Sequence, residues 1–214
     1  MRDIPVFTTQ LGVASLTLSQ IPYTRQAYIR IQDTADPKLF LDECVDFCKA
    51  AGADQIYATG HDFLEKFTLH TAIWLMTCPA ASLQNTNACL FPVQQATAEK
   101  WREIYNERMR QVPNAAYITV RKMREIISSG SAYFVHKNGD LLGIGIASTG
   151  KIDAVIATLG GAGCDVLCAL SGALSEDMAQ VEVASANVPA VRLYERVGFV
   201  KAQEISKWYK IYSL

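Results

Sequence analysis

The chain has 214 residues, of which half are hydrophobic and 19% are charged, and its formal net charge is -1. This length and apolar content are sufficient for one large domain or two small ones with a buried core, and they exclude an intrinsically disordered chain. Nucleic-acid-binding proteins carry a clear basic excess, so the near-neutral charge predicts no nucleic-acid partner.

No segment predicts export or insertion into a membrane. The N-terminal residues lack the apolar core and the cleavage site of a signal peptide. The stretch 68–98 has no charged residue, but its continuous apolar part, Ala72–Met76, is far too short to span a bilayer. We therefore expect a protein with no membrane partner.

The cysteines predict neither a metal site nor a disulfide framework. None of the six cysteines belongs to a CxxC pair, and the chain has only three histidines. Two pairs, Cys44 with Cys48 and Cys164 with Cys168, have the i,i+4 spacing of one helix face, where cysteine is typically a small buried side chain. Free thiols of this kind are typical of a cytoplasmic protein, which is our expectation here.

In the first part of the chain, β-rich segments alternate with one strong helical pattern. Pro37 suits the start of that helix and Gly52 suits its end. In chain order we expect strands over 13–19 and 26–32, a helix over 38–51, a strand over 53–59, a helix-like segment over 61–67 and a strand over 72–76.

The periodic signals are clearer in the second part. Thr97 is a candidate N-cap, Gly130 ends a helix, and Asn138-Gly139 between two apolar runs predicts a hairpin with a type I′ turn. In chain order we expect a strand from Cys89, helices over 94–110 and 119–128, strands over 132–136, 141–147 and 152–159, a helix over 165–174, a strand over 180–184, a helix over 189–197 and a strand over 205–212. This order favours a mixed sheet.

The first part looks like an incomplete copy of the second. Residues 53–59 align with residues 178–184, and the two cysteine pairs fall in the corresponding helix of each part. We interpret residues 1–85 as a partial, degenerate repeat and residues 86–214 as a complete domain. Coincidence between two α/β segments is the alternative.

The most informative segment is Val181–Phe199. In it a strand is followed by Asn187, by a helix with the sequence Leu193-Tyr194-Glu195-Arg196, and by a Gly-Phe exit. This segment resembles the closing motif of the GNAT superfamily of N-acetyltransferases, and the order of elements from Cys89 onward is similar to that family. The resemblance implies the GNAT acyl-CoA N-acyltransferase fold, an α/β fold whose mixed central sheet is flanked by helices.

The resemblance also implies a donor substrate, acetyl-CoA, and roles for two side chains. Asn187 would bind the pantetheine region, and Tyr194 would lie near the thioester sulfur as the general acid for the departing thiolate. The alternative for Tyr194 is a ring packed under the sheet with its hydroxyl satisfied. The strand residues that would bind pantetheine through their backbone are Val155, Ile156 and Ala157.

A glycine-rich turn precedes the helix over 165–174. The resemblance implies that its backbone N–H groups bind the pyrophosphate. The residues concerned are Gly161, Ala162, Gly163 and Cys164. Thr158 occupies the position where the family has Arg or Gln, and a register shifted by two residues would put Asp165 at the last small position of the motif. Both registers lack the arginine, and a plain strand–helix connection is the alternative.

No general base is assigned. Glu182 and Asp153 lie on strands, while Glu107 and Asn114 lie in the region between the first two helices, which in this family faces the acceptor. A lone carboxylate on such elements is usually solvated or salt-bridged.

The sequence thus predicts a metal-free N-acetyltransferase that transfers an acetyl group from acetyl-CoA to a primary amine of a small molecule or peptide, by direct attack in a ternary complex. The runner-up is a non-catalytic GNAT-like protein that senses CoA or mediates an interaction, which the missing arginine favours. A nucleotide-binding enzyme has no support, because Walker-type motifs are absent from the sequence. The partial repeat would either complete the sheet or mediate a homodimer.

Overall fold

A computed structural model describes residues 6–83 and 85–214, and the chain divides into two compact units. Unit 1 consists of the described residues up to Ile73 together with Glu204–Leu214, and unit 2 is Trp74–Gln203. This division differs from the boundary expected after residue 85. The reason is that two long strands, β5 (Thr68–Pro79) and β11 (Val200–Ser213), each contribute residues to both units.

Unit 1 contains one end of the sheet. Its strands, in spatial order, are β1 (Val6–Thr8), β2 (Gly12–Thr17), β3 (Gln26–Thr34), β4 (Gln55–Thr59), the end of β11 and the start of β5. From β1 to β11 the neighbours are antiparallel except for the parallel pair β3 and β4. A one-turn helix, α1 (Ile21–Thr24), lies between β2 and β3 in the chain.

The helix α2 (Pro37–Ala50) packs on unit 1 through residues at helical spacing. Phe40, Cys44 and Cys48 are fully buried there, and Tyr209 of β11 belongs to the same core. The expected helix over 38–51 is confirmed. The expected helix-like segment over 61–67 is instead a short 3-10 helix, η1 (Asp62–Lys66), in which the His61 ring nitrogen caps the Phe63 N–H at 3.0 Å.

Unit 2 contains the rest of the sheet. In spatial order its strands are the start of β11, the end of β5, then β10 (Met178–Ala184), β9 (Lys151–Ala157), β8 (Asp140–Ser148), β7 (Ala132–Lys137) and β6 (Cys89–Pro92). β9 and β10 are parallel, and β6 to β9 are antiparallel. Asn138 and Gly139 both have positive φ, 53° and 91°, so the predicted hairpin is confirmed.

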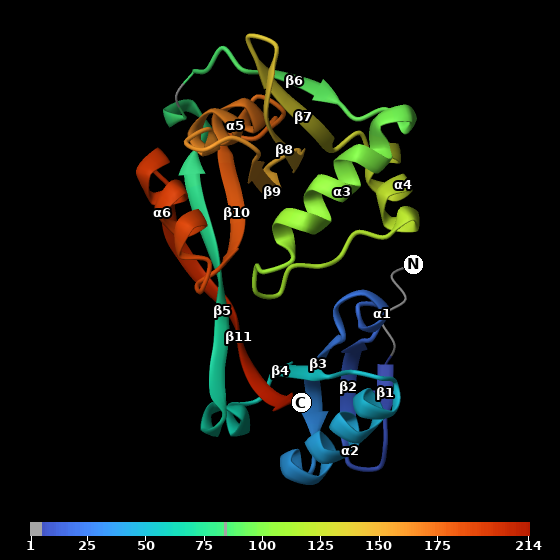
Figure 1. Ribbon diagram of the computed structural model, residues 1–214. Coiled ribbons are helices and arrows are strands. Elements are labelled where there is room, and N and C mark those ends of the chain that lie inside the picture. Colours follow the sequence, from blue (N-terminus) through green and yellow to red (C-terminus); the bar gives the residue numbers. More distant parts are fainter. Residues whose placement is uncertain (1–5, 84) are drawn as a thin grey trace. The chain divides into compact units, whose positions relative to one another are not determined.

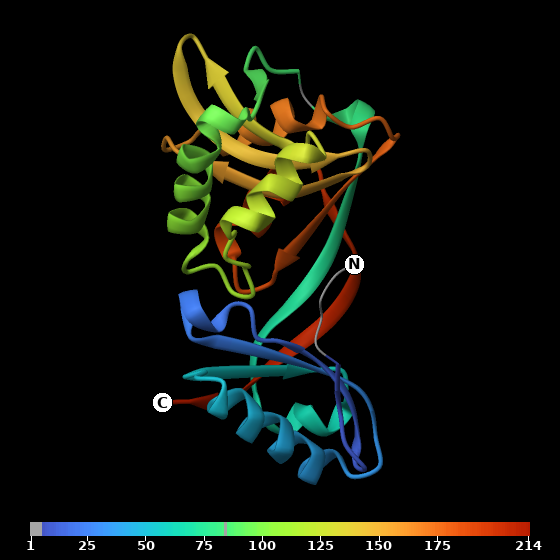
Figure 2. The same ribbon diagram turned by 90° about the vertical axis from the view of Figure 1, so that its right-hand side faces the viewer.

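Two pairs of helices cover the two faces of unit 2 (Figures 1 and 2). The helices α3 (Ala98–Met109) and α4 (Val120–Ser128) pack on one face through Trp101, Tyr105 and Met123. The helices α5 (Gly163–Ser171) and α6 (Val188–Val197) pack on the other face. The order of elements expected from Cys89 onward is therefore confirmed.

Two 3-10 turns precede the helices of unit 2, η2 (Ala80–Ser82) and η3 (Gln95–Thr97). Thr97 precedes α3, as expected of an N-cap, but its hydroxyl does not cap that helix. Instead the hydroxyl donates to the Gln94 carbonyl at 3.1 Å and accepts from the Gln94 N–H at 3.2 Å, which closes η3.

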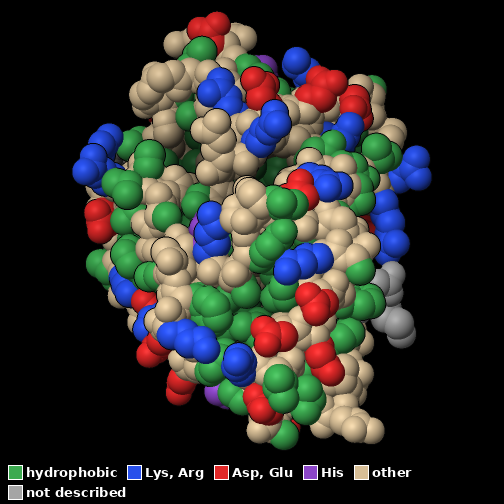
Figure 3. Space-filling model, turned by 60° about the horizontal axis from the view of Figure 1, so that its bottom comes forward, with side chains coloured by type: hydrophobic (Ala, Val, Ile, Leu, Met, Phe, Trp, Pro, Cys, Tyr) green, Lys and Arg blue, Asp and Glu red, His purple; other side chains and the backbone are tan. Residues whose placement is uncertain are grey.

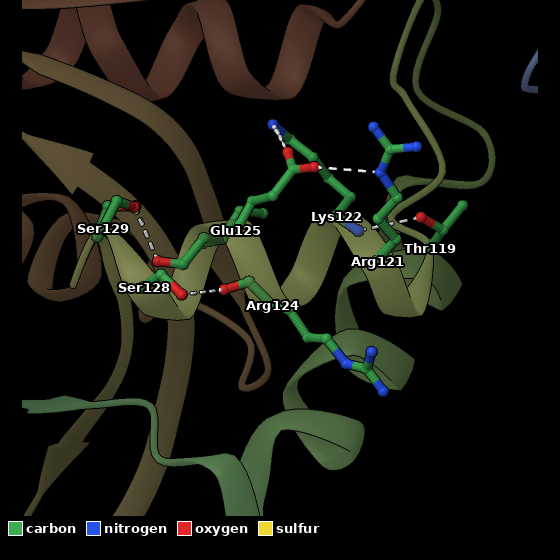
Figure 4. Close-up of polar contacts among 9 residues, drawn as sticks. Thr119, Arg121, Lys122, Arg124, Glu125, Ser128 and Ser129 are labelled. Carbon is green, nitrogen blue, oxygen red and sulfur yellow. Dashed lines mark hydrogen bonds and ion pairs between the residues drawn. The ribbon is translucent and has the colours of Figure 1, made fainter. Parts of the chain in front are cut away.

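The solvent-facing side of α4 is polar (Figure 4). Thr119 caps the helix, because its hydroxyl accepts from the Lys122 N–H at 3.1 Å. Glu125 forms ion pairs with Lys122 at 3.1 Å and Arg121 at 3.5 Å, and the Ser128 hydroxyl donates to the Arg124 carbonyl. Exposed pairs of this kind contribute little to stability, so the buried side of α4 fixes its position.

On the face shown in Figure 3, Lys and Arg side chains lie among Asp and Glu side chains, as the near-neutral net charge suggests. Within residues 6–83 and 85–214, no helix is long and apolar enough to cross a membrane. The same residues contain no group of three or more His, Cys, Asp or Glu side chains that could hold a metal ion.

Candidate functional site

The parallel strands β9 and β10 separate soon after they meet. Their register contains only two residue pairs, Gln180 with Lys151 and Val181 with Ile152. The neighbouring ladder between β8 and β9 has a register shift at Ile146/Ala147, which leaves Asp153 as an extra residue on β9. Beyond this bulge β9 pairs with β8 alone among the described strands, so its other edge is open.

The open edge of β9 presents the backbone groups of Val155 and Ala157, two of the three residues predicted to bind pantetheine. The Thr158 N–H donates to the Leu142 carbonyl at 2.9 Å, so alternation along the antiparallel ladder directs the backbone groups of Ile156 toward β8 as well. The N–H and C=O groups of Val155 and Ala157 therefore point toward the opening. Ile156 is placed differently, because its backbone belongs to the β8 ladder and its side chain lies in the core under α3.

The glycine-rich turn leads from this edge into α5. Gly161 has a φ of +81°, which favours glycine. Ala162 is buried at the N-cap position, and its methyl group cannot cap the helix, so no side-chain cap occupies the N–H groups at the start of α5. The N–H of Ala162 itself donates to the Leu159 carbonyl at 3.3 Å. Gly163 has a different role, because a Cβ there would lie 3.1 Å from Leu193 of α6. Cys164 follows in the first turn, half-buried.

The charge of Asp165, in the first turn of α5, is compensated. The Thr86 hydroxyl donates to its carboxylate at 2.6 Å, and the Lys137 ammonium of β7 lies 3.1 Å away. Hydrogen bonds from Thr86 and then Lys137 hold the pKa of Asp165 below its usual range. The negative charge that the sequence places near an anion site is therefore paired with a lysine.

Asn187 precedes α6, and Tyr194 lies within that helix. Asn187 is the N-cap, and its side-chain oxygen accepts from the Ala190 N–H at 3.4 Å, so its amide NH2 group is the part left for a ligand. Tyr194 is only 6% exposed, and its ring centroid lies 5.7 Å from that of Phe199. Burial raises the pKa of Tyr194 to about 12, so the hydroxyl keeps its proton at neutral pH.

Comparison with known proteins identifies the fold but not a family by sequence. No family model and no curated protein matches the sequence. A functionally unknown conserved protein from Staphylococcus epidermidis is similar in structure, with a TM-score of 0.65 and 14% identity over 98% of this chain and 94% of its own. A candidate acetyltransferase from Pyrococcus horikoshii has a TM-score of 0.61 and 13% identity, over 95% of this chain and 70% of its own.

A third similar structure carries the family name. It is an acetyltransferase of the GNAT family from Colwellia psychrerythraea, with a TM-score of 0.51 and 12% identity over 96% of this chain and 84% of its own. The chain has the GNAT acetyltransferase fold. The structural similarity establishes the fold, but identities this low say nothing of the substrate. What the site at β9, β10 and α5 can do must therefore be argued from this chain's own residues.

An ion-pair cluster lies where β9 and β10 meet in unit 2. The Lys151 ammonium lies 3.1 Å from Asp153 and 2.9 Å from Glu182, and all three side chains are partly exposed. The sequence placed both carboxylates on strands, but it did not indicate that one lysine bridges them. The cluster carries one net negative charge beside the opening.

The segment between α3 and α4 is held by side chains of α3. The Asn106 amide bonds Ile118 in both directions, at 2.8 and 3.0 Å, and Arg102 donates to the Tyr117 hydroxyl. Asn114 has a φ of 60°, and its side-chain oxygen is buried without a hydrogen-bond partner among the described residues. Glu107 is exposed on α3.

Among the described residues of unit 1, the parallel strands do not separate in the same way. Its parallel strands β3 and β4 keep register over five residue pairs, from Gln26–Gln55 to Arg30–Thr59. The Asp36 carboxylate caps α2 by accepting from the N–H groups of Lys38 and Leu39, both at 3.1 Å. In unit 1 the strand edge is therefore paired, and a carboxylate already occupies the helix N-terminus that would bind an anion.

Proposed function

We propose that unit 2 is an N-acetyltransferase that transfers an acetyl group from acetyl-CoA to a primary amine of a small molecule or peptide. The observation that carries the proposal is the opening between β9 and β10, which continues into a glycine turn and a helix without a side-chain cap. An open strand edge binds an extended amide chain by backbone hydrogen bonds, and a free helix N-terminus binds phosphate.

The residues at the site fit this donor. Val155 and Ala157 would bind the amides of pantetheine, and the N–H groups of Gly161, Gly163 and Cys164 would bind the pyrophosphate. The N–H of Ala162 would not take part, because it donates to the Leu159 carbonyl. When bound, acetyl-CoA supplies a thioester carbonyl carbon. The amine nitrogen forms a C–N bond to that carbon, the C–S bond breaks, and the sulfur gains a proton while the nitrogen loses one.

Tyr194 is the candidate hydrogen-bond donor to the departing sulfur, which leaves as the thiolate and takes its proton from water. Its hydroxyl is protonated throughout the neutral range, because burial raises its pKa to about 12. On the acceptor side, the partly exposed Asp153 and Glu182 carboxylates are groups that could receive the amine's proton, directly or through water.

The test is binding followed by turnover. Acetyl-CoA should raise the melting temperature of the full chain, because a ligand that binds only the native state stabilises it. Release of free thiol from acetyl-CoA should then depend on one member of a panel of primary amines. Binding without amine-dependent release across the panel would favour the non-catalytic alternative, and no binding at millimolar acetyl-CoA would reject both.

We also infer that unit 1 is a degenerate copy of unit 2, and that unit 1 no longer binds an acyl donor. The order β3, α2, β4 parallels the order β9, α5, β10, and each helix carries a cysteine pair at i,i+4. The paired strand edge and the Asp36 cap support the loss of the site. Native mass spectrometry should therefore find one CoA per chain.

A further inference from the structure

We infer that Arg108, on α3, supplies the positive charge that binds the phosphates of the acyl donor in unit 2. The inference rests on the proposed function. It places the phosphate-binding positive charge on α3, which packs on the face of the sheet opposite to α5. In the family pattern this role falls to a residue of the turn itself, and this chain has Thr158 at that position.

Thr158 is not a substitute for the missing side chain. Its hydroxyl donates to the Leu141 carbonyl at 2.7 Å, and its N–H donates to the Leu142 carbonyl. Both donors thus extend the ladder with β8 and are not available to an anion. Lys137 is not a substitute either, because its ammonium is paired with the carboxylate of Asp165.

Arg108 reaches the turn from α3. One of its terminal nitrogens, Nη2, donates to the Thr158 carbonyl at 3.3 Å, two residues before Gly160. Trp101 and Tyr105 lie seven and three residues earlier on the same helix and are buried against the sheet. Since residues three and seven apart share a helix face, packing of these rings directs Arg108 toward β9.

The charge of Arg108 is not compensated within the part of the chain that the structure describes. Its side chain is exposed, and no carboxylate there lies within ion-pair distance of it. Arg102 on the same helix differs, because it pairs with Glu99. A guanidinium has five donors and binds phosphate in a bidentate manner, and a single carbonyl contact leaves most of those donors free.

The experiment measures CoA affinity in full-length variants. In R108Q the side chain stays polar but loses the charge, and its amide nitrogen ends two bonds short of the position of Nη2, so the contact with the Thr158 carbonyl is lost as well. We expect R108Q to weaken CoA binding by roughly 10- to 100-fold. R108K should lose less, because it keeps the charge, and R110Q, which removes an exposed arginine at the end of α3, should bind within about twofold of the wild type.

Pantetheine, which carries no phosphate, is the second probe. If Arg108 binds phosphate, R108Q and the wild type should bind pantetheine equally, and the salt dependence of CoA affinity should be weaker in R108Q. Unchanged CoA affinity in R108Q, or equal losses for CoA and pantetheine, would overturn the assignment while leaving the proposed function intact. A wild-type chain that binds neither probe would instead reject the proposed function.

Discussion

Replacing Tyr194 with phenylalanine should slow turnover without unfolding the protein. The substitution removes one oxygen and keeps the ring that packs against Phe199, so the free energy of unfolding should change by no more than about 1.5 kcal/mol. The melting temperature and the affinity for acetyl-CoA should therefore stay close to those of the wild type.

The size of the effect on turnover follows from the pKa of Tyr194. At about 12, this pKa lies roughly 3.5 units above that of an ordinary thiol, so complete proton transfer to a thiolate would cost about 5 kcal/mol. The hydroxyl would instead act by a hydrogen bond that strengthens as charge develops on sulfur. Hydrogen bonds to charged groups contribute about 1.5–3 kcal/mol, which corresponds to a loss in kcat of roughly 10- to 100-fold.

The assay is release of CoA thiol with an acceptor from the amine panel, with kcat and the KM for acetyl-CoA measured separately. The matched control is Tyr209→Phe, which removes a hydroxyl from a ring that is equally buried but belongs to the core of unit 1. If Tyr194→Phe kept kcat within twofold of the wild type, or if both variants lost the same amount, the role given to Tyr194 would be wrong.

Three further predictions concern the turn, the stoichiometry and pH. Gly161→Val should weaken CoA binding, because valine is strained at a φ of +81°, whereas Gly160→Ala, where a Cβ meets no atom within 4 Å, should bind normally in the same titration. Isothermal titration of the full chain should give one CoA site, and a second site of similar affinity would show that unit 1 retains one. Burial raises the pKa of Tyr105 and Tyr194 to about 12, so their contribution to stability is complete below pH 10 and is lost as pH rises toward 12. Urea unfolding should show this as a fall of up to about 3 kcal/mol per group, and a flat profile up to pH 11.5 would contradict it.

Local sequence signals predicted most of the elements but not their partners. Pro37 and Gly198 mark the ends of helices because their effects on the backbone act within a few residues, and the Asn138-Gly139 hairpin is equally local. The place of β5 beside β10 was not predictable, since a strand's pattern shows which face is buried and not which strand lies next to it.

In the candidate site, too, local features were predictable from the sequence and contacts between distant residues were not. The motif from Val181 to Phe199 lies in one stretch of the chain, so its resemblance was visible in the sequence. The contacts of Arg108 with Thr158 and of Lys137 with Asp165 join residues 50 and 28 positions apart, and no short motif encodes such pairs. The sequence therefore indicated that an arginine was missing but not which residue could replace it.

The contribution of β5 and β11 to both units has a consequence for how the protein is made. During synthesis, β4 leaves the ribosome about 150 residues before the part of β11 that pairs with it, Tyr209 to Ser213, so unit 1 has an unpaired strand edge for most of translation. Cutting the gene after residue 85 would not yield two independent domains, because the first fragment would lack β11 and the second would lack β5. Co-expressed fragments should regain a native fold only by reassembling with each other.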